Sequence, residues 1–261
     1  MSEAVGSEAA GSEAIRAENL VKSFGNVVAL NGLSMQVARG ETLGILGDNG
    51  AGKSTLIKIL TGYHQPDSGQ VFVDGKPVQL GSVDGARALG IECVYQDLAL
   101  VNGLSIYHNM FLKREILWGG PFGFLNHREM RRRAREALEE IGIAVASVDL
   151  EVGQLSGGQR QAIAVARAVS SNARILLLDE PLAAMGAREA GLIIDLIDRL
   201  KARGDIAIVM IAHNYAQTLE LCDRVILVQH GRITFESRAA ATSAEELLEI
   251  VRREYRAARA G

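Results

Sequence analysis

The chain has 261 residues, of which 48% are hydrophobic and 23% charged, enough to bury the core of one large domain or two small ones. Its formal net charge of −3 lacks the basic excess of nucleic-acid-binding proteins, so we expect no nucleic-acid partner. The longest apolar run, 206–212, is too short to cross a bilayer and no signal peptide precedes it, so we expect a soluble intracellular protein that other chains hold at any membrane.

The first forty residues divide into a tail and a pair of strands. Residues 1–14 repeat a Ser-Glu-Ala unit with intervening glycines, which predicts a disordered low-complexity tail. The alternating pattern of 15–37 predicts antiparallel strands, and 70–75 adds a strand that ends in an Asp-Gly turn. Phe24 lies in this layer, where position alone favours a strand core residue over an adenine-stacking platform.

A glycine-rich segment at 47–55 fits the pattern G-x-x-x-x-G-K-[ST] between an apolar strand and a helix. Glycines let successive backbone amides turn toward one anionic centre, and the positive end of the following helix adds to the field. Lys53 supplies a charge for the β- and γ-phosphates, and the Ser54 hydroxyl can ligate Mg²⁺. The pattern predicts nucleotide binding but does not distinguish ATP from GTP. The residues assigned to this site are Gly47, Asp48, Asn49, Gly50, Ala51, Gly52, Lys53, Ser54 and Thr55.

The middle of the chain carries a second set of signals. Residues 86–96 read as a helix end, a glycine stop and a buried strand, which leaves Gln96 in the following loop as a candidate contact for Mg²⁺ or the attacking water. Residues 97–168 are mostly helical in pattern, with an amphipathic charged helix over 128–141. Between them, 118–124 is an irregular aromatic loop, either packed on its own domain or exposed to a partner.

A second helix start suited to phosphate follows at Leu155-Ser156-Gly157-Gly158-Gln159. Ser156 is a good N-cap, and the two glycines expose the backbone amides. One glycine pair before a helix is a weak signal, because a simple capped turn is its usual cause.

Two strand ends complete the candidate site. The apolar run 174–178 predicts a doubly buried parallel strand with Asp179 and Glu180 at its carboxyl edge, where open α/β sheets bind ligands. Asp179 is placed to hold Mg²⁺, and Glu180 to accept a proton from the attacking water. A purely structural role for both acids would require cationic partners. His213 ends the strand 206–212, where it can reach a γ-phosphate.

The rest of the chain reads as a helix, a strand pair and a last helix. The helix covers 189–202, the strands 224–228 and 231–235, and a capping box at 243–246 starts the last helix.

The order and spacing of these motifs resemble the nucleotide-binding subunit of an ATP-binding-cassette transporter over about 15–250. The segments 47–50, 95–100 and 156–161 are similar to carbohydrate importers of the ribose, xylose and fructose group, in their single-cassette form. The resemblance implies an α/β P-loop NTPase with a RecA-like core, an antiparallel β subdomain and a helical subdomain at about 97–168. The remaining residues, 251–261, would form the end of the C-terminal helix and a tail.

The resemblance also implies a role for each motif. Phe24 would stack on adenine, and Gln96 would sense both Mg²⁺ and the permease. Glu180 would be the general base and His213 the γ-phosphate contact. The segment 156–159 would bind the γ-phosphate of ATP held by the other subunit.

Each chain has two helix starts suited to phosphate but only one Lys-Ser pair and one Asp-Glu pair. This count independently favours a two-fold dimer around two ATP molecules. The implied activity is an ATPase that drives uptake of a small sugar or polyol. Its partners would be integral-membrane permeases and an extracytoplasmic sugar-binding protein, which puts the chain peripherally on the cytoplasmic face of the inner membrane.

Three other functions stay open on the sequence: a cassette for amino-acid import or for export, a non-transport cassette in DNA repair or translation, and a switch that closes on ATP without turnover. The chain also departs from the family pattern after Pro181, with Leu-Ala-Ala-Met at 182–185 and glycine at 186. These departures bear on cross-talk between the two sites more than on hydrolysis.

Overall fold

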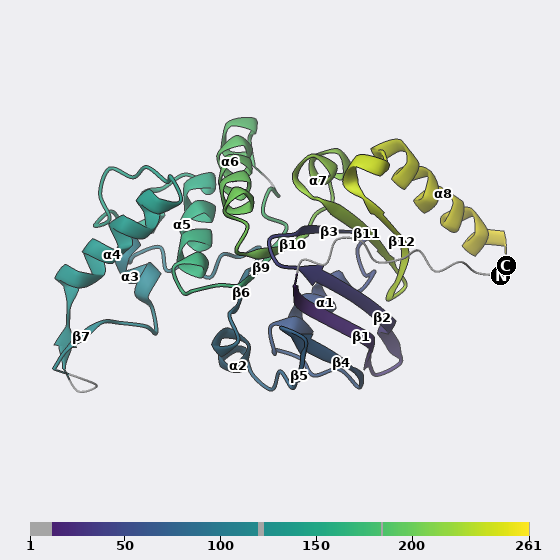
Figure 1. Cartoon of the computed structure of the whole chain (residues 1–261). Helices are drawn as coiled ribbons and strands as arrows, with labels where there is room; N and C mark the ends of the chain where they lie inside the picture. The colour runs from purple at the N-terminus through teal and green to yellow at the C-terminus, as the bar shows by residue number, and fades with distance from the viewer. Residues whose placement is uncertain (1–11, 120–122, 184, 261) are drawn as a thin grey trace.

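The computed structural model describes residues 12–119, 123–183 and 185–260. A six-stranded sheet forms the centre of the molecule in the order β12-β11-β3-β10-β9-β6 (Figure 1). All neighbours pair in parallel except β12, which pairs antiparallel to β11. The strands are β3 (Thr42–Leu46), β6 (Ile91–Val94), β9 (Ile175–Asp179), β10 (Ala207–Ile211), β11 (Arg224–Gln229) and β12 (Arg232–Arg238).

The inner strands are buried on both faces, as their unbroken apolar runs predict. Along β9, Leu176 and Leu178 join the core on one side of the sheet, whereas Ile175 and Leu177 join the core on the other. The first core includes residues of α5 (Gly157–Val169) and α6 (Ala187–Arg203), and the second includes residues of α1 (Lys53–Leu60). The sheet is therefore held between helices on both sides.

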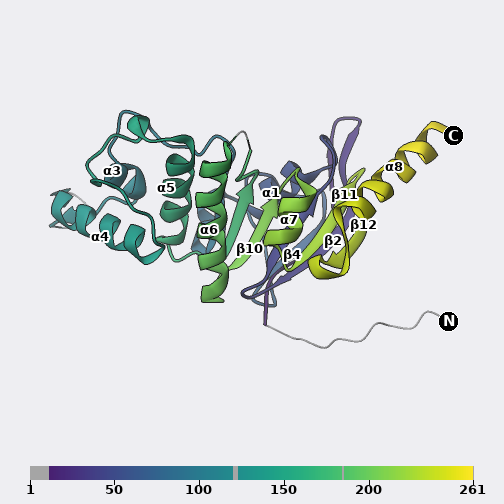
Figure 2. The same cartoon turned by 90° about the horizontal axis from the view of Figure 1, so that it is seen from above.

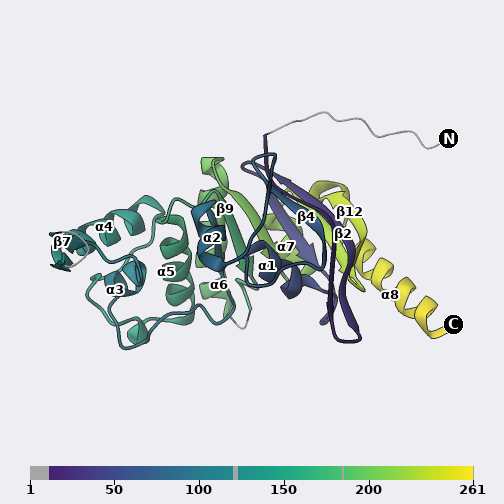
Figure 3. The ribbon, with the colours of Figure 1, turned by 90° about the horizontal axis from the view of Figure 1, so that it is seen from below.

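An antiparallel sheet in the order β2-β1-β4-β5 packs on the α1 side (Figure 3). Its strands are β1 (Glu13–Phe24), β2 (Val27–Ala38), β4 (Ser68–Val73) and β5 (Lys76–Val78), and α2 (Val83–Ala88) follows. β1 begins at Glu13 and Ala14 is buried, so the expected tail of residues 1–14 extends two residues too far. Residues 1–11 lie outside the described part.

Most of the helices between Gln96 and Val169 gather at one end of the molecule, opposite α8 (Figures 1 and 2). They are α3 (Ile106–Phe111), α4 (His127–Glu140) and α5, with the short 3-10 helix η1 (Val152–Gln154) before α5. Most of the remaining C-terminal residues form α7 (Tyr215–Leu221), the 3-10 helix η2 (Ala239–Ala241) and α8 (Ala244–Ala260). Within the described ranges, no helix combines the length and apolarity needed to cross a bilayer.

The prediction of an irregular loop over 118–124 is wrong at both ends of that range. β7 (Leu117–Trp118) pairs antiparallel with β8 (Phe124–Leu125), while residues 120–122 lie outside the described part. Trp118 is 62% exposed and Phe124 88% exposed, so these aromatic side chains do not pack into their own domain. The expected α/β architecture, with a parallel core, an antiparallel β part and a helical part, is confirmed.

Candidate functional site

Four neighbouring strands deliver the predicted residues to one edge of the sheet. β3, β10, β9 and β6 lie side by side and parallel, so their carboxyl ends meet at the same edge. Gly47 follows β3, His213 follows β10 and Gln96 follows β6, while Asp179 ends β9 and Glu180 comes next. Residues up to 166 positions apart in the sequence therefore share one edge, because the strand order makes these four strands neighbours.

The loop between β3 and α1 depends on glycine for its shape. Gly47, Gly50 and Gly52 all have positive φ, at 144°, 81° and 109°. A Cβ on Gly47 would lie 2.2 Å from the Val228 carbonyl oxygen, and one on Gly52 would lie 2.4 Å from that of Ala29. A side chain at either position would therefore distort the loop.

The loop ends in a helix start that suits an anion. No side chain caps α1, and its first turn carries no acidic residue, so its amide dipoles are not neutralised locally. Lys53 begins this helix and is buried, and its ammonium donates to the Gly47 carbonyl at 2.7 Å and the Asp48 carbonyl at 2.9 Å. Burial lowers the pKa of Lys53, while Glu180, Asp48 and Asp179 oppose that shift. The Lys53 ammonium, held by two carbonyls and near three acids, can move onto a phosphate without leaving the site.

The two acids lie in different environments. Burial, with a smaller contribution from Glu180, raises the pKa of Asp179, and the nearby Lys53 opposes this shift. Glu180 has φ +52°, and its amide donates to the Ile211 carbonyl at 3.0 Å. Its carboxylate Oε1 lies 2.5 Å from His213 Nε2. Asp179 therefore favours a counter-charge such as a cation, whereas Glu180 is oriented by a histidine.

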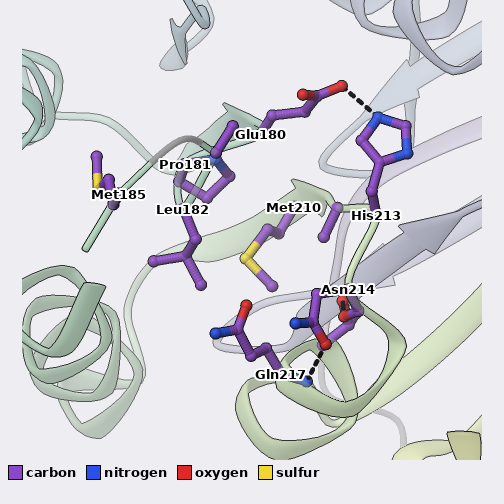
Figure 4. A pocket seen from close by; sticks show the side chains of 11 residues that line it. Glu180, Pro181, Leu182, Met185, Met210, His213, Asn214 and Gln217 are labelled. Atoms are coloured by element: carbon purple, nitrogen blue, oxygen red, sulfur yellow. Dashed lines mark hydrogen bonds and ion pairs between the residues drawn. The ribbon is translucent and has the colours of Figure 1, made fainter. Parts of the chain in front are cut away.

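Glu180 and His213 line a pocket of about 290 Å³ between the loops that follow β9 and β10 (Figure 4). Figure 4 shows the Glu180–His213 contact on one side of this pocket, with Leu182 and Met210 below it. Since Glu180 and His213 both line this open pocket, a water molecule can reach either side chain.

The oxygen donors at the edge fit Mg²⁺ by their chemistry. Ser54 offers a hydroxyl, Gln96 an amide oxygen and Asp179 a carboxylate, all hard donors, and Ser54 and Gln96 are exposed. Among the described residues, no group of three or more His, Cys, Asp and Glu side chains could hold a metal by itself. That donor set agrees with an ion that needs one protein carboxylate and completes its shell with phosphate oxygens and water.

The loop carrying Gln96 also lines a groove of about 390 Å³. Gly153 and Arg160, on either side of the Ser156 motif, line the same groove. The groove thus lies between the loop that carries Gln96 and the segment around Ser156.

The second predicted phosphate site is the start of α5, and its expected cap is confirmed. Ser156 and Gln159 form a reciprocal capping box, with bonds of 3.3 Å and 3.0 Å. The sequence did not predict that Glu189 on α6 contacts this helix start. Its Oε1 accepts a hydrogen bond from the Gly158 amide at 3.4 Å. This amide bond lowers the pKa of Glu189, and a bond from Ser156 adds to the effect. A carboxylate of the same chain therefore lies at this helix start, where the amide dipoles favour a negative charge.

Within a single copy of the chain, the structure does not bring all of the predicted site residues together. Within the described ranges, no hydrogen bond or ion pair joins 156–159 to the phosphate loop. Phe24 lies at the end of β1, 45% exposed, in edge contact with His64 at 5.2 Å between ring centroids. The core reading of Phe24 is therefore wrong, because the strand end carries it to the surface.

Arg167 is a second residue that the sequence reading missed. It lies on α5 and donates to the carbonyls of the loop after Gln96, namely Leu98 and Ala99. One signal was available: a lone arginine among the small apolar residues of 162–169 requires a polar partner.

Comparison with known proteins gives consistent results. The ABC transporter domain family matches residues 30–183. The xylose/arabinose import ATP-binding protein XylG of Sulfolobus acidocaldarius is 44% identical, over 92% of this chain and 94% of its own. The fructose import ATP-binding protein FrcA of Rhizobium meliloti is 42% identical, over 84% and 85% of the two chains.

Solved structures agree in fold. A nucleotide-free ATP-binding cassette from an ABC transporter superposes with a TM-score of 0.76 at 28% identity, over 92% of this chain and 95% of that one. The dimeric post-hydrolysis cassette MJ0796, bound to ADP and Pi, gives 0.71 at 25% identity, over 86% and 98%. Since the family domain matches more than half of the chain and its relatives align along nearly all of it, this protein belongs to the ABC transporter family.

Proposed function

We propose that this protein is the ATP-hydrolysing subunit of a sugar importer, working as a head-to-tail homodimer. Two relatives that align along most of their length are named for xylose/arabinose import and fructose import. The observation that carries the proposal is the split site: the phosphate loop, acids and histidine share one sheet edge, while Ser156 starts a separate helix. A second copy brings its Ser156 helix start to the first copy's phosphate loop, and the reverse.

In this proposal the residues 47–55 hold the ATP phosphates, and Phe24 stacks on adenine. Lys53 moves from its two carbonyl contacts onto the β- and γ-phosphates. His213 turns from Glu180 to the γ-phosphate, which frees the Glu180 carboxylate to accept a proton from the attacking water. Water then displaces ADP from the γ-phosphoryl group, and ADP and phosphate leave.

Mg²⁺ completes the proposed site. Ser54, Gln96 and Asp179 would hold the ion, which would neutralise charge on the phosphate oxygens as the bond to ADP breaks. The segment 156–159 of the second copy contributes amide dipoles to the γ-phosphate, in the place where Glu189 lies in the single chain.

The proposed domain begins with β1 at Glu13 and continues to about 250, with a helical subdomain at about 97–168. The groove beside Gln96 is the surface we assign to a permease segment, because movement there reaches both Gln96 and the Ser156 helix. An extracytoplasmic sugar-binding protein would deliver the solute, and the ATPase would lie peripherally on the cytoplasmic face of the inner membrane.

The test is transport across the membrane of inside-out vesicles that contain the permease pair, with this chain and MgATP on the outer, ATPase-bearing face and the sugar-binding protein inside. Export of labelled pentose or fructose from the vesicle lumen to the outside, dependent on ATP, is the expected result. Lys53→Ala should abolish it. Transport of an amino acid but no sugar would overturn the substrate class, and transport that survives Lys53→Ala would overturn the role of this chain.

A further inference from the structure

The loop that follows Gln96 has an unusual backbone. Leu98 and Ala99 both have left-handed conformations, with φ of +58° and +46°, although neither is glycine. Two such residues in a row persist only where surrounding contacts fix them. Within the loop the Leu98 amide donates to the Tyr95 carbonyl and the Ala99 amide to the Asp97 carbonyl. These local bonds leave the Leu98 and Ala99 carbonyls to be held from elsewhere.

Arg167 supplies that contact from α5. One guanidinium nitrogen, Nη1, donates to the Ala99 carbonyl at 2.7 Å, and the other, Nη2, donates to the Leu98 carbonyl at 2.9 Å. A planar fork that spans two consecutive carbonyls fixes both their spacing and their direction. The contact therefore holds the left-handed turn in place.

The surroundings of Arg167 favour its contact with these two carbonyls. Burial is the largest influence on its pKa and lowers it. Across the described residues, no carboxylate forms an ion pair with Arg167, and its hydrogen-bond acceptors are the two carbonyls. Because a desolvated guanidinium without its acceptors is costly, the loop and the helix stabilise each other.

We propose that Arg167 is a positioning residue that fixes Gln96 relative to the helix starting at Ser156, so that the loop and α5 move together. The inference rests on the proposed roles of Gln96 and of Ser156. Gln96 lies two residues before Leu98, the first residue of the clamped turn, and Ser156 caps the same helix that carries Arg167. A shift of α5 is thus transmitted to Gln96 through two hydrogen bonds.

The test compares steady-state phosphate release of Arg167→Met and Arg167→Lys with the parent chain, using full-length protein. Arg167→Met should lower kcat on the order of tenfold to a hundredfold, the range expected when a contact residue shifts by about an ångström. Affinity for fluorescent ADP, which depends on the phosphate loop, should stay within about twofold of the parent. Arg167→Lys keeps the charge without the fork, so its kcat should lie between the two.

Arg199→Met is the matched control. Arg199 on α6 also donates to two consecutive carbonyls, those of Ile141 and Gly142, at 3.2 Å and 2.8 Å. Its hydrogen bonds hold the end of α4 and not the loop after Gln96, so its loss should leave kcat within about twofold of the parent.

A double-mutant cycle separates positioning from general support of the fold. If Arg167 acts through Gln96, then Arg167→Met should add little to the loss already caused by Gln96→Ala. Effects on kcat that multiply, or an unchanged kcat in Arg167→Met, would overturn the proposal. Should Arg167→Met fail to fold, the same cycle with Arg167→Lys decides. Failure of the proposed function shows separately, as turnover that survives Lys53→Ala.

Discussion

Glu180 combines backbone strain with a fixed side chain. Its left-handed φ of +52° costs about 1–3 kcal/mol for a residue other than glycine. The bond from its amide to the Ile211 carbonyl ties it to β10, and the contact with His213 comes from the same strand end. Two neighbouring strands therefore hold this carboxylate in place, which agrees with a group that must meet a water molecule in one orientation.

Replacing Glu180 with glutamine removes the proton acceptor but keeps the shape and an oxygen for His213. We expect Glu180→Gln to bind ATP normally and to release phosphate 10²–10⁴-fold more slowly, roughly the contribution of a general base. Phosphate release under steady-state conditions and nucleotide affinity measure the two effects. Asp195→Asn, at an exposed position on α6, is the control and should turn over normally. Full turnover in Glu180→Gln would exclude Glu180 as the base.

The raised pKa of Asp179 predicts that the stability of the folded chain depends on pH. Its pKa is raised in the folded chain, so the folded state is penalised once the pH exceeds the unfolded value of 3.8. Asp179→Asn should therefore raise Tm modestly at pH 7, since the carboxylate is partly screened by solvent. The gain should shrink as the pH falls toward 4, because the parent carboxyl becomes neutral. Tm from pH 4 to pH 8 is the measurement, and a gain that grows on acidification would contradict the explanation.

At the scale of elements, α5 and α6 approach closely where the Ser156 helix begins. A Cβ on Gly158 would lie 2.9 Å from the Glu189 Cβ and 3.1 Å from its Cα. Four alanines further along α5 are also buried, on more than one side of the helix: Ala162, Ala164, Ala166 and Ala168. The helix start is thus held in position by the close packing at Gly158 as well as by its cap.

Gly158→Ala should force the two helices apart. We expect a loss of about 1–3 kcal/mol in the free energy of unfolding, as for other overpacked positions. Gly191→Ala on α6 is the matched control, because a Cβ there meets no atom within 4 Å. The control should gain up to about 1 kcal/mol through helix propensity. Urea unfolding of both variants measures the difference, and an equal response in the two would contradict the packing argument.

The whole molecule presents two proposed phosphate-binding surfaces, which a single chain does not bring together. The sheet edge carries Lys53, Glu180 and His213, whereas the α5 start carries Ser156 and contacts Glu189 instead. Two copies related by a two-fold axis can use both surfaces at each nucleotide. The structural relative MJ0796 is described as dimeric, with ADP and Pi bound.

Mixing two inactive variants tests this arrangement. Lys53→Ala removes the phosphate lysine, and Ser156→Asp keeps an N-cap while placing a negative charge against the γ-phosphate. Each variant alone should be inactive. An equal mixture should recover up to about a quarter of parental phosphate release, because half of the dimers then carry one intact site out of two.

The control for the mixing experiment is a mixture of Lys53→Ala with Glu180→Gln, which both alter the sheet edge. In that heterodimer each site lacks one residue, so no recovery is expected. A site completed within one chain would give no recovery in either mixture, and that outcome would exclude the head-to-tail dimer.

Much of this protein is determined by local sequence. The order of the strands and helices follows from apolar runs, glycine turns and caps, which act over a few residues. The glycine pattern of 47–55 and the polar residues just after buried strands also predict which side chains reach the ligand edge. Parallel strands have their carboxyl ends at the same edge, so the sequence predicts that Gln96, Asp179, Glu180 and His213 lie at that edge, whereas the strand order that makes them neighbours came from the structure.

Other features depend on contacts between distant segments and became known with the tertiary structure. Arg167 and Leu98 are 69 positions apart, and Glu189 and Gly158 are 31 apart, so no local pattern pairs them. The exposure of Phe24 and of the β7–β8 pair likewise depends on what packs beside each strand end. Periodicity reports which residues favour burial, whereas the three-dimensional arrangement of elements decides which of them have a partner to bury against.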